Sequence, residues 1–183
     1  MDTPVLHPLL STRRSTRAFD PDAEVSDAEL AVLLEAARWA PSSWNAQPWR
    51  FLVGLRDSDV HKRIFGHLAA HNQRWAGRAS ALLAAGYLTR AADGGPLPHA
   101  AYDLGQAVAH LSVQASALGL WVHQMAGFDA AGLHAEFGLP DDLALLVVVA
   151  VGRLGDPSGL PEDLWARESA PRERRPVSDL LLP

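Results

Sequence analysis

Pro41-Ser42-Ser43-Trp44-Asn45-Ala46-Gln47-Pro48-Trp49-Arg50 is the stretch around which the chain is organised. The prolines near its two ends stop a helix or strand from running through it. The carboxamides of Asn45 and Gln47 donate and accept hydrogen bonds, and the two indoles supply flat apolar area. The stretch therefore either suits a planar heterocycle with polar edges, or is an ordinary loop whose tryptophans pack inward and whose amides cap helices.

The composition is that of an ordinary globular chain. Its 183 residues fit one domain, 1–183, and 48% of them are hydrophobic, which is enough for a sizeable core. The 16 basic and 21 acidic residues give a net charge of −5, which argues against a nucleic-acid binder or a polybasic membrane-surface protein. The absence of cysteine excludes disulfides, thiol catalysis and thiolate metal sites.

Targeting signals are also missing from the sequence. Met1–Leu10 has no basic segment followed by a long apolar run, so we expect no signal peptide. No apolar run reaches the ~20 residues that a membrane-spanning helix needs. We therefore expect a soluble, cytoplasmic protein.

Hydrophobic spacing and capping residues predict the elements on both sides of the opening stretch. Ser26 and Glu29 form a capping box, which begins a helix that runs to about residue 39. A strand is predicted at 50–55. The remaining predictions are a first helix that packs Val5, Leu6, Leu9 and Leu10, mostly helical structure at 57–77, helices at 100–118 and 128–138, and strands at 80–87, 121–125 and 143–151.

The tail, 152–183, is rich in proline and charge and shows little helical or strand pattern before 177–182. Such a segment is either disordered or lies on a neighbouring subunit.

Three arginines and two hydroxyls stand together in Arg13-Arg14-Ser15-Thr16-Arg17. Arginine offers a fork of donors to a phosphate, and hydroxyls add short hydrogen bonds. The segment is a candidate anion site, although a solvated basic patch is the commoner fate of such a run.

Side-chain catalysis has no visible machinery in this sequence. It contains neither a Gly-x-Ser-x-Gly elbow nor a phosphate-binding loop ending in Gly-Lys-Ser/Thr. His67 and His71 stand four residues apart without a third ligand, so we predict no metal site. If the protein is an enzyme, a bound cofactor carries the chemistry.

The motifs occur in an order that resembles the nitroreductase family of FMN-dependent oxidoreductases. They are Arg13–Phe19, Leu33–Phe51, Asn72-Gln73-Arg74-Trp75, Ala117–Leu120 with Gly127-Phe128-Asp129, the strand ending at Gly152, and Arg172–Pro176. The resemblance covers nearly the whole chain. It implies an α+β fold with a mixed, mostly antiparallel sheet covered by helices, in an intertwined homodimer. The tail from about 153 to 183 would cross to the partner and extend its sheet.

The same resemblance assigns the cofactor-binding residues. Arg13, Ser15 and Arg17 would hold the FMN phosphate and ribityl chain, with Arg14 beside them. Arg172 and Arg174 would close on the phosphate from the tail. Pro41, Ser42 and Ser43 would come from the other subunit, against the ring and ribityl chain. Asn45 is a further cofactor-binding candidate.

The flavin ring would lie against two further segments. Asn72 would bond the isoalloxazine edge. Gln124, Met125, Ala126 and Gly127 would lie against the ring face, with a backbone N–H reaching N5. Enteric-type relatives typically have glutamate at the position of Ala126. Trp44 is a candidate wall of the substrate pocket, or otherwise a core residue.

The implied activity is ping-pong hydride transfer from NAD(P)H through flavin N5 to a small-molecule acceptor such as a nitroaromatic, a quinone or an activated alkene. Two alternatives stay open. One keeps the fold but changes the flavin reaction to dehalogenation or fragmentation, or changes the electron donor. The other is a non-enzymatic binding or assembly module.

Overall fold

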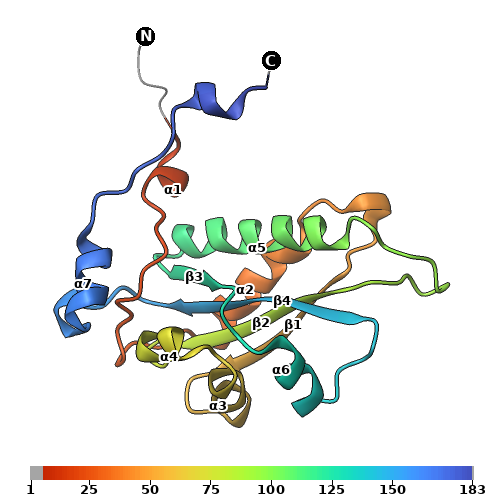
Figure 1. The fold of residues 1–183 in the computed structure, drawn as a ribbon, viewed down its shortest axis with the longest axis horizontal. Coiled ribbons are helices and arrows are strands. Elements are labelled where there is room, and N and C mark those ends of the chain that lie inside the picture. The colour runs from red at the N-terminus through yellow and green to blue at the C-terminus, as the bar shows by residue number, and fades with distance from the viewer. Residues whose placement is uncertain (1–5, 183) are drawn as a thin grey trace.

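The computed structural model of the chain describes residues 6–182. It shows an α+β fold built on one four-stranded sheet of order β1-β2-β4-β3 (Figure 1). The strands are β1 (Trp49–Leu55), β2 (Ala81–Leu88), β3 (Trp121–Met125) and β4 (Leu143–Gly152). All three strand pairs are antiparallel. The predicted α+β class and the four predicted strands are confirmed.

The described part of the chain contains seven helices. The helices α2, α3, α4, α5 and α6 confirm the predictions made from spacing and caps. Among residues 6–182 no helix combines the length and apolarity needed to cross a bilayer. The bounds are α1 (Pro8–Ser11), α2 (Asp27–Arg38), α3 (Asp59–Gly66), α4 (Ala70–Ala76), α5 (Ala100–Ala117), α6 (Ala130–Glu136) and α7 (Glu162–Ser169), with 3₁₀ turns at Ser43–Asn45, Pro157–Gly159 and Val177–Leu180.

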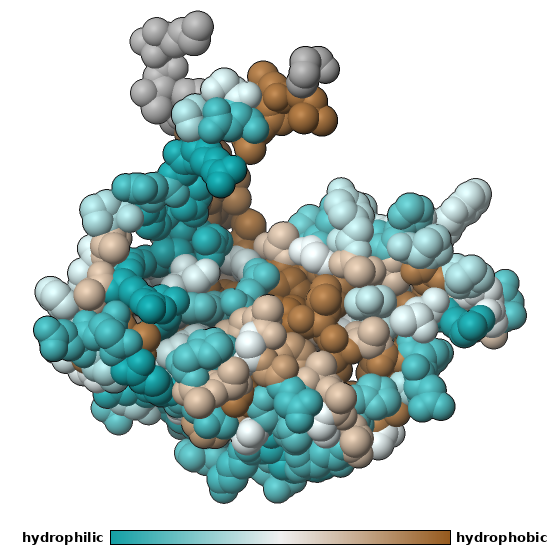
Figure 2. Space-filling view, viewed as in Figure 1, coloured by the Kyte–Doolittle hydropathy of each residue, from teal (hydrophilic) through white to brown (hydrophobic). Residues whose placement is uncertain are grey.

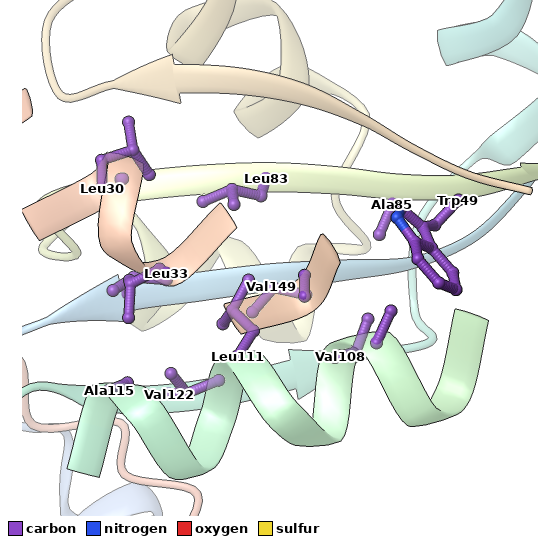
Figure 3. Close-up of a cluster of buried hydrophobic side chains, with 14 of the residues drawn as sticks. Leu30, Leu33, Trp49, Leu83, Ala85, Val108, Leu111, Ala115, Val122 and Val149 are labelled. Carbon is purple, nitrogen blue, oxygen red and sulfur yellow. The ribbon is translucent and has the colours of Figure 1, made fainter. Parts of the chain in front are cut away.

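Strand β2 is buried on both faces of the sheet. Leu83 and Ala85 face a cluster formed with α2 and α5, which Figure 3 shows with Leu33, Leu111 and other residues of these helices. Leu82 and Ala84 face a second cluster, formed with α3, α4 and α6. The unbroken apolar run in the sequence reflects this two-sided burial, since a half-buried strand would alternate.

The N-terminal helix is shorter than predicted. It begins at Pro8, because a proline at the first helical position has no unsatisfied N–H. Leu6 lies before it, and Leu6 and Leu10 remain about half exposed, so the predicted packing of these leucines is wrong. Val5 of the same prediction lies outside the described residues.

The prediction that the tail has little helical structure before residue 177 is wrong for α7. Only Leu164 and Glu168 of this helix are buried. They stand four residues apart and so share one face. Because one of the two inward residues is a carboxylate, hydrophobic spacing gave no signal there.

His61 packs against Phe65 below β1 and is 5% exposed. Its Nε2 has no hydrogen-bond partner among the described residues. Burial lowers the pKa of His61, so the folded state binds the proton less readily than the unfolded state. This part of the stability is complete above the unfolded pKa of about 6.5 and is lost as the pH falls through that value toward the folded pKa.

We therefore predict that His61→Leu raises the free energy of unfolding by about 1 kcal/mol at pH 7, because an unpaired buried nitrogen is removed. The variant should also lose less stability than the wild type between pH 6.5 and 5. Urea unfolding across this range measures both effects, with His110→Leu at an exposed helix position as the control. A steeper acid loss in His61→Leu would contradict the assignment.

Candidate active site

A cavity of about 370 Å³ lies where α4, the end of β3 and α7 meet. The residues that line it include Arg17, Asn72 and the whole segment Gln124–Gly127. The structure thus brings together three parts of the predicted site that are far apart in the sequence.

Asn72 is held in a fixed position at this cavity. It is 6% exposed, and its Nδ2 donates to the carbonyl of Gly127 at 3.0 Å. The same carbonyl accepts from Ala69 N at 2.9 Å. A Cβ added at Gly127 would lie 2.9 Å from Asn72 Nδ2 and 2.9 Å from His71 Cε1. A glycine at 127 is therefore what allows the carboxamide to sit here.

The predicted phosphate ligands form a cluster between the tail and the N-terminal segment, which run side by side in Figure 1. Arg172 donates to the carbonyls of Arg13, at 2.6 Å, and Ser11. Arg13 donates to Ser15 Oγ at 3.3 Å. Burial lowers the pKa of Arg13, and the charges of Arg174 and Arg172 lower it further. Cations that lower one another's pKa in this way are stabilised by an anion placed among them.

Arg14 points elsewhere. Its Nε lies 3.6 Å from Glu168 on α7, so its position next to the other arginines in sequence does not place it in their cluster.

His123 connects the cavity to the arginine segment. Its Nδ1 lies 2.8 Å from the carbonyl of Thr16, and its ring centroid is 4.4 Å from that of Trp75. Burial lowers the pKa of His123 to about 4, and the charge of Arg17 acts in the same direction. The ring is therefore neutral near pH 7 and, because a carbonyl only accepts, Nδ1 carries the hydrogen.

Residues 41–45 of this chain do not belong to the first cavity. Ser43 and Trp44 line a second cavity, of about 320 Å³, together with residues 96–100 and Asp103. None of residues 41–45 is among the residues that line the first cavity. Trp44 is 99% exposed, so the interpretation of Trp44 as core is wrong, whereas Trp49 is buried.

The backbone of this loop is strained and tightly held. Trp44 and Asn45 both have φ of 54°, a left-handed conformation that costs a non-glycine residue roughly 1–2 kcal/mol. Asp103, 3% exposed, accepts from Ser43 N at 3.1 Å, and Ser42 Oγ accepts from Gln47 N at 3.0 Å. These bonds keep the indole of Trp44 in solvent at the edge of the cavity.

Several lining residues of the first cavity were not found from the sequence. Arg74 is two residues from Asn72, which was its only signal; it pairs with Asp163 through two bonds of 2.8 and 2.6 Å. Three more come from α4 and β3: His71, Trp75 and His123. The last three come from α7, a helix that the sequence pattern did not predict: Asp163, Leu164 and Arg167.

The donor set fits a flat group that carries a phosphate. The arginine cluster supplies charged forks for the phosphate, and the fixed carboxamide and the backbone of 124–127 supply partners for a polar ring edge. The space left by the missing side chain at Gly127 is already used to seat Asn72.

Residues 10–153 match the family model described as "Nitroreductase family". The chain belongs to the nitroreductase family. An uncharacterised 15.4 kDa protein of Mycolicibacterium smegmatis is 38% identical over 133 residues, which are 68% of this chain and 88% of that protein. An oxygen-insensitive NADPH nitroreductase of Helicobacter pylori is 41% identical over 75 residues, which are 41% of this chain but only 35% of that protein.

Among solved nitroreductase-fold structures, an oxidoreductase containing FMN superposes with a TM-score of 0.92 at 35% identity and covers 100% of this chain and 93% of its own. A nitroreductase family protein from Streptococcus pneumoniae, 18% identical, superposes with a TM-score of 0.76 over 96% and 98% of the two chains, which shows the shared fold alone.

The glycine contacts predict opposite effects of one substitution at two positions. Gly127→Ala should lower the free energy of unfolding by about 1–3 kcal/mol, because the new methyl group displaces Asn72. Gly105→Ala, on α5 with nothing within 4 Å of the added Cβ, should raise it by about 0.5–1 kcal/mol. Chemical denaturation of the two variants measures this difference. Equal effects at the two sites would contradict the steric argument.

Proposed function

We propose that this nitroreductase-family chain is an FMN-dependent NAD(P)H oxidoreductase. The observation that carries the proposal is the convergence of Arg17, Asn72 and Gln124–Gly127 on one cavity beside the cluster of Arg13, Arg172 and Arg174. The structurally similar oxidoreductase that contains FMN and the relatives named as NADPH nitroreductases support the cofactor and the donor.

The arginines bind the phosphate in this proposal. Arg13, Arg17, Arg172 and Arg174 carry permanent charge, and Ser15 adds a hydroxyl donor. A flavin phosphate of about −2 charge would relieve the repulsion from Arg174 and Arg172, which lowers the pKa of Arg13 in addition to burial. Arg14 supports the segment through Glu168 rather than as a phosphate ligand.

Asn72 would hold the ring edge, and Gln124, Met125, Ala126 and Gly127 would lie against the ring face. A backbone N–H of this segment would reach N5, and Ala126 would add no carboxylate there. Bound FMN supplies hydride chemistry, which makes ping-pong turnover the expected scheme: donor and acceptor use one site in turn. The acceptors are nitroaromatics, quinones or activated alkenes, which stack on flat apolar surfaces such as that of Trp44.

The site is completed by a second copy of the chain. Within one chain, residues 41–45 are absent from the lining of the first cavity, and we propose that Pro41, Ser42, Ser43 and Asn45 serve the cofactor of the other protomer. The tail ends in exposed apolar residues that need a partner surface: Val177, Leu180, Leu181 and Leu182. Figure 2 shows a hydrophobic group at the end of the tail, away from the body. The tail then packs on the partner in an intertwined homodimer, located in the cytoplasm.

Charge reversal at the cavity tests the cofactor. Arg17→Glu places an anion against the phosphate and should abolish retention of FMN through purification. Lys62→Glu changes the net charge equally at an exposed position of α3 and should retain it. The ratio of flavin absorbance to protein absorbance measures both. Full retention in Arg17→Glu would remove the phosphate assignment.

Anaerobic addition of NADH or NADPH tests the reaction. The flavin absorbance of the purified protein should bleach with at least one of the two donors and return when a quinone is added. A flavin that neither donor bleaches would keep the cofactor but assign the chain to a different flavin reaction. A protein that takes up no FMN would leave only a binding or assembly role.

A further inference from the structure

Glu168 is a buried carboxylate that the proposed reaction does not use. It is 4% exposed and projects from α7 toward the arginine segment. Its Oε1 accepts from Thr16 Oγ1 at 2.6 Å, and its Oε2 accepts from Arg17 N at 2.9 Å. One carboxylate thus holds a side chain and a backbone donor of two consecutive residues.

Thr16 is held in one conformation by its burial and its hydrogen bonds. It is fully buried, its Oγ1 also accepts from Ala18 N at 3.1 Å, and its carbonyl accepts from His123. The backbone at 16–17 is therefore fixed from α7 on one side and from β3 on the other. Ser15 and Arg17, the two phosphate-facing residues next to Thr16, take their direction from it.

We infer that Glu168 is a positioning residue for phosphate recognition: through Thr16 and the N–H of Arg17 it sets the conformation of the arginine segment that binds the FMN phosphate. The inference rests on the proposed function. It also gives α7 a role, because the helix that carries Glu168 contributes Leu164 and Arg167 to the lining of the cavity.

Charge alone makes the opposite prediction. A carboxylate beside an arginine cluster reduces the local positive potential, so its neutralisation should strengthen the binding of an anion. A positioning role requires the reverse, because a misdirected segment loses charge-assisted bonds to the phosphate. The direction of the change in affinity therefore separates the two roles.

The experiment titrates flavin-free full-length protein with FMN and with riboflavin, which lacks the phosphate, and follows flavin fluorescence. Glu168→Gln keeps the volume of the side chain but offers one acceptor oxygen to two donors. We expect it to weaken FMN by about tenfold or more and riboflavin by less than about twofold. Glu162→Gln, an exposed position of the same helix, should leave both affinities unchanged.

Two further variants cover the case in which Glu168→Gln does not fold. Thr16→Val removes the hydroxyl and should reproduce the selective loss of FMN affinity, and Thr16→Ser keeps the hydroxyl and should bind as the wild type does. Equal losses for FMN and riboflavin, or tighter FMN binding in Glu168→Gln, would overturn the inference. A wild type that binds neither flavin would instead overturn the proposed function.

Discussion

The burial of β2 on both faces is the constraint on which the rest of the structure depends. Ala81–Ala85 is fully buried, and the strand pairs with β1 on one side and β4 on the other. Because β2 is packed on both faces and paired along both edges, the helices above and below the sheet pack against a close-packed centre. Through β4 this order reaches β3, whose Gln124 and Met125 are in register with Val149 and Val148. The cavity begins where β3 ends, and its floor is therefore rigid.

The arginine cluster, in contrast to the buried strand, opposes the stability of the fold. Bringing Arg13 near Arg172 and Arg174 costs free energy in the absence of an anion: burial lowers the pKa of Arg13, and the charges of Arg174 and Arg172 lower it further. Hydrogen bonds to other groups offset this cost: carbonyls of the N-terminal segment accept from the Arg172 guanidinium, and Glu168 holds Thr16.

Sequence reasoning succeeded where one residue type determines the outcome. The capping box at Ser26 fixed the start of α2, and the apolar run of 143–151 predicted β4. The expectation that Arg17 and Asn72 belong to one site came from the order of the motifs, which resembles that of a known family. Glu168 and α7 were missed because a buried carboxylate breaks apolar periodicity. The opposite fates of Trp44 and Trp49 were open too, since the left-handed backbone that exposes Trp44 depends on Asp103, a residue 59 positions away by number.

The pairing of Arg172 with Arg13 has a consequence for how the protein is made. The two residues are 159 positions apart, so the cluster cannot close while the chain is still being translated through its middle. The sheet and the floor of the cavity can form earlier, from segments that end at Gly152. The arginine cluster therefore becomes complete only after residue 172 has left the ribosome, later than the core on which it lies.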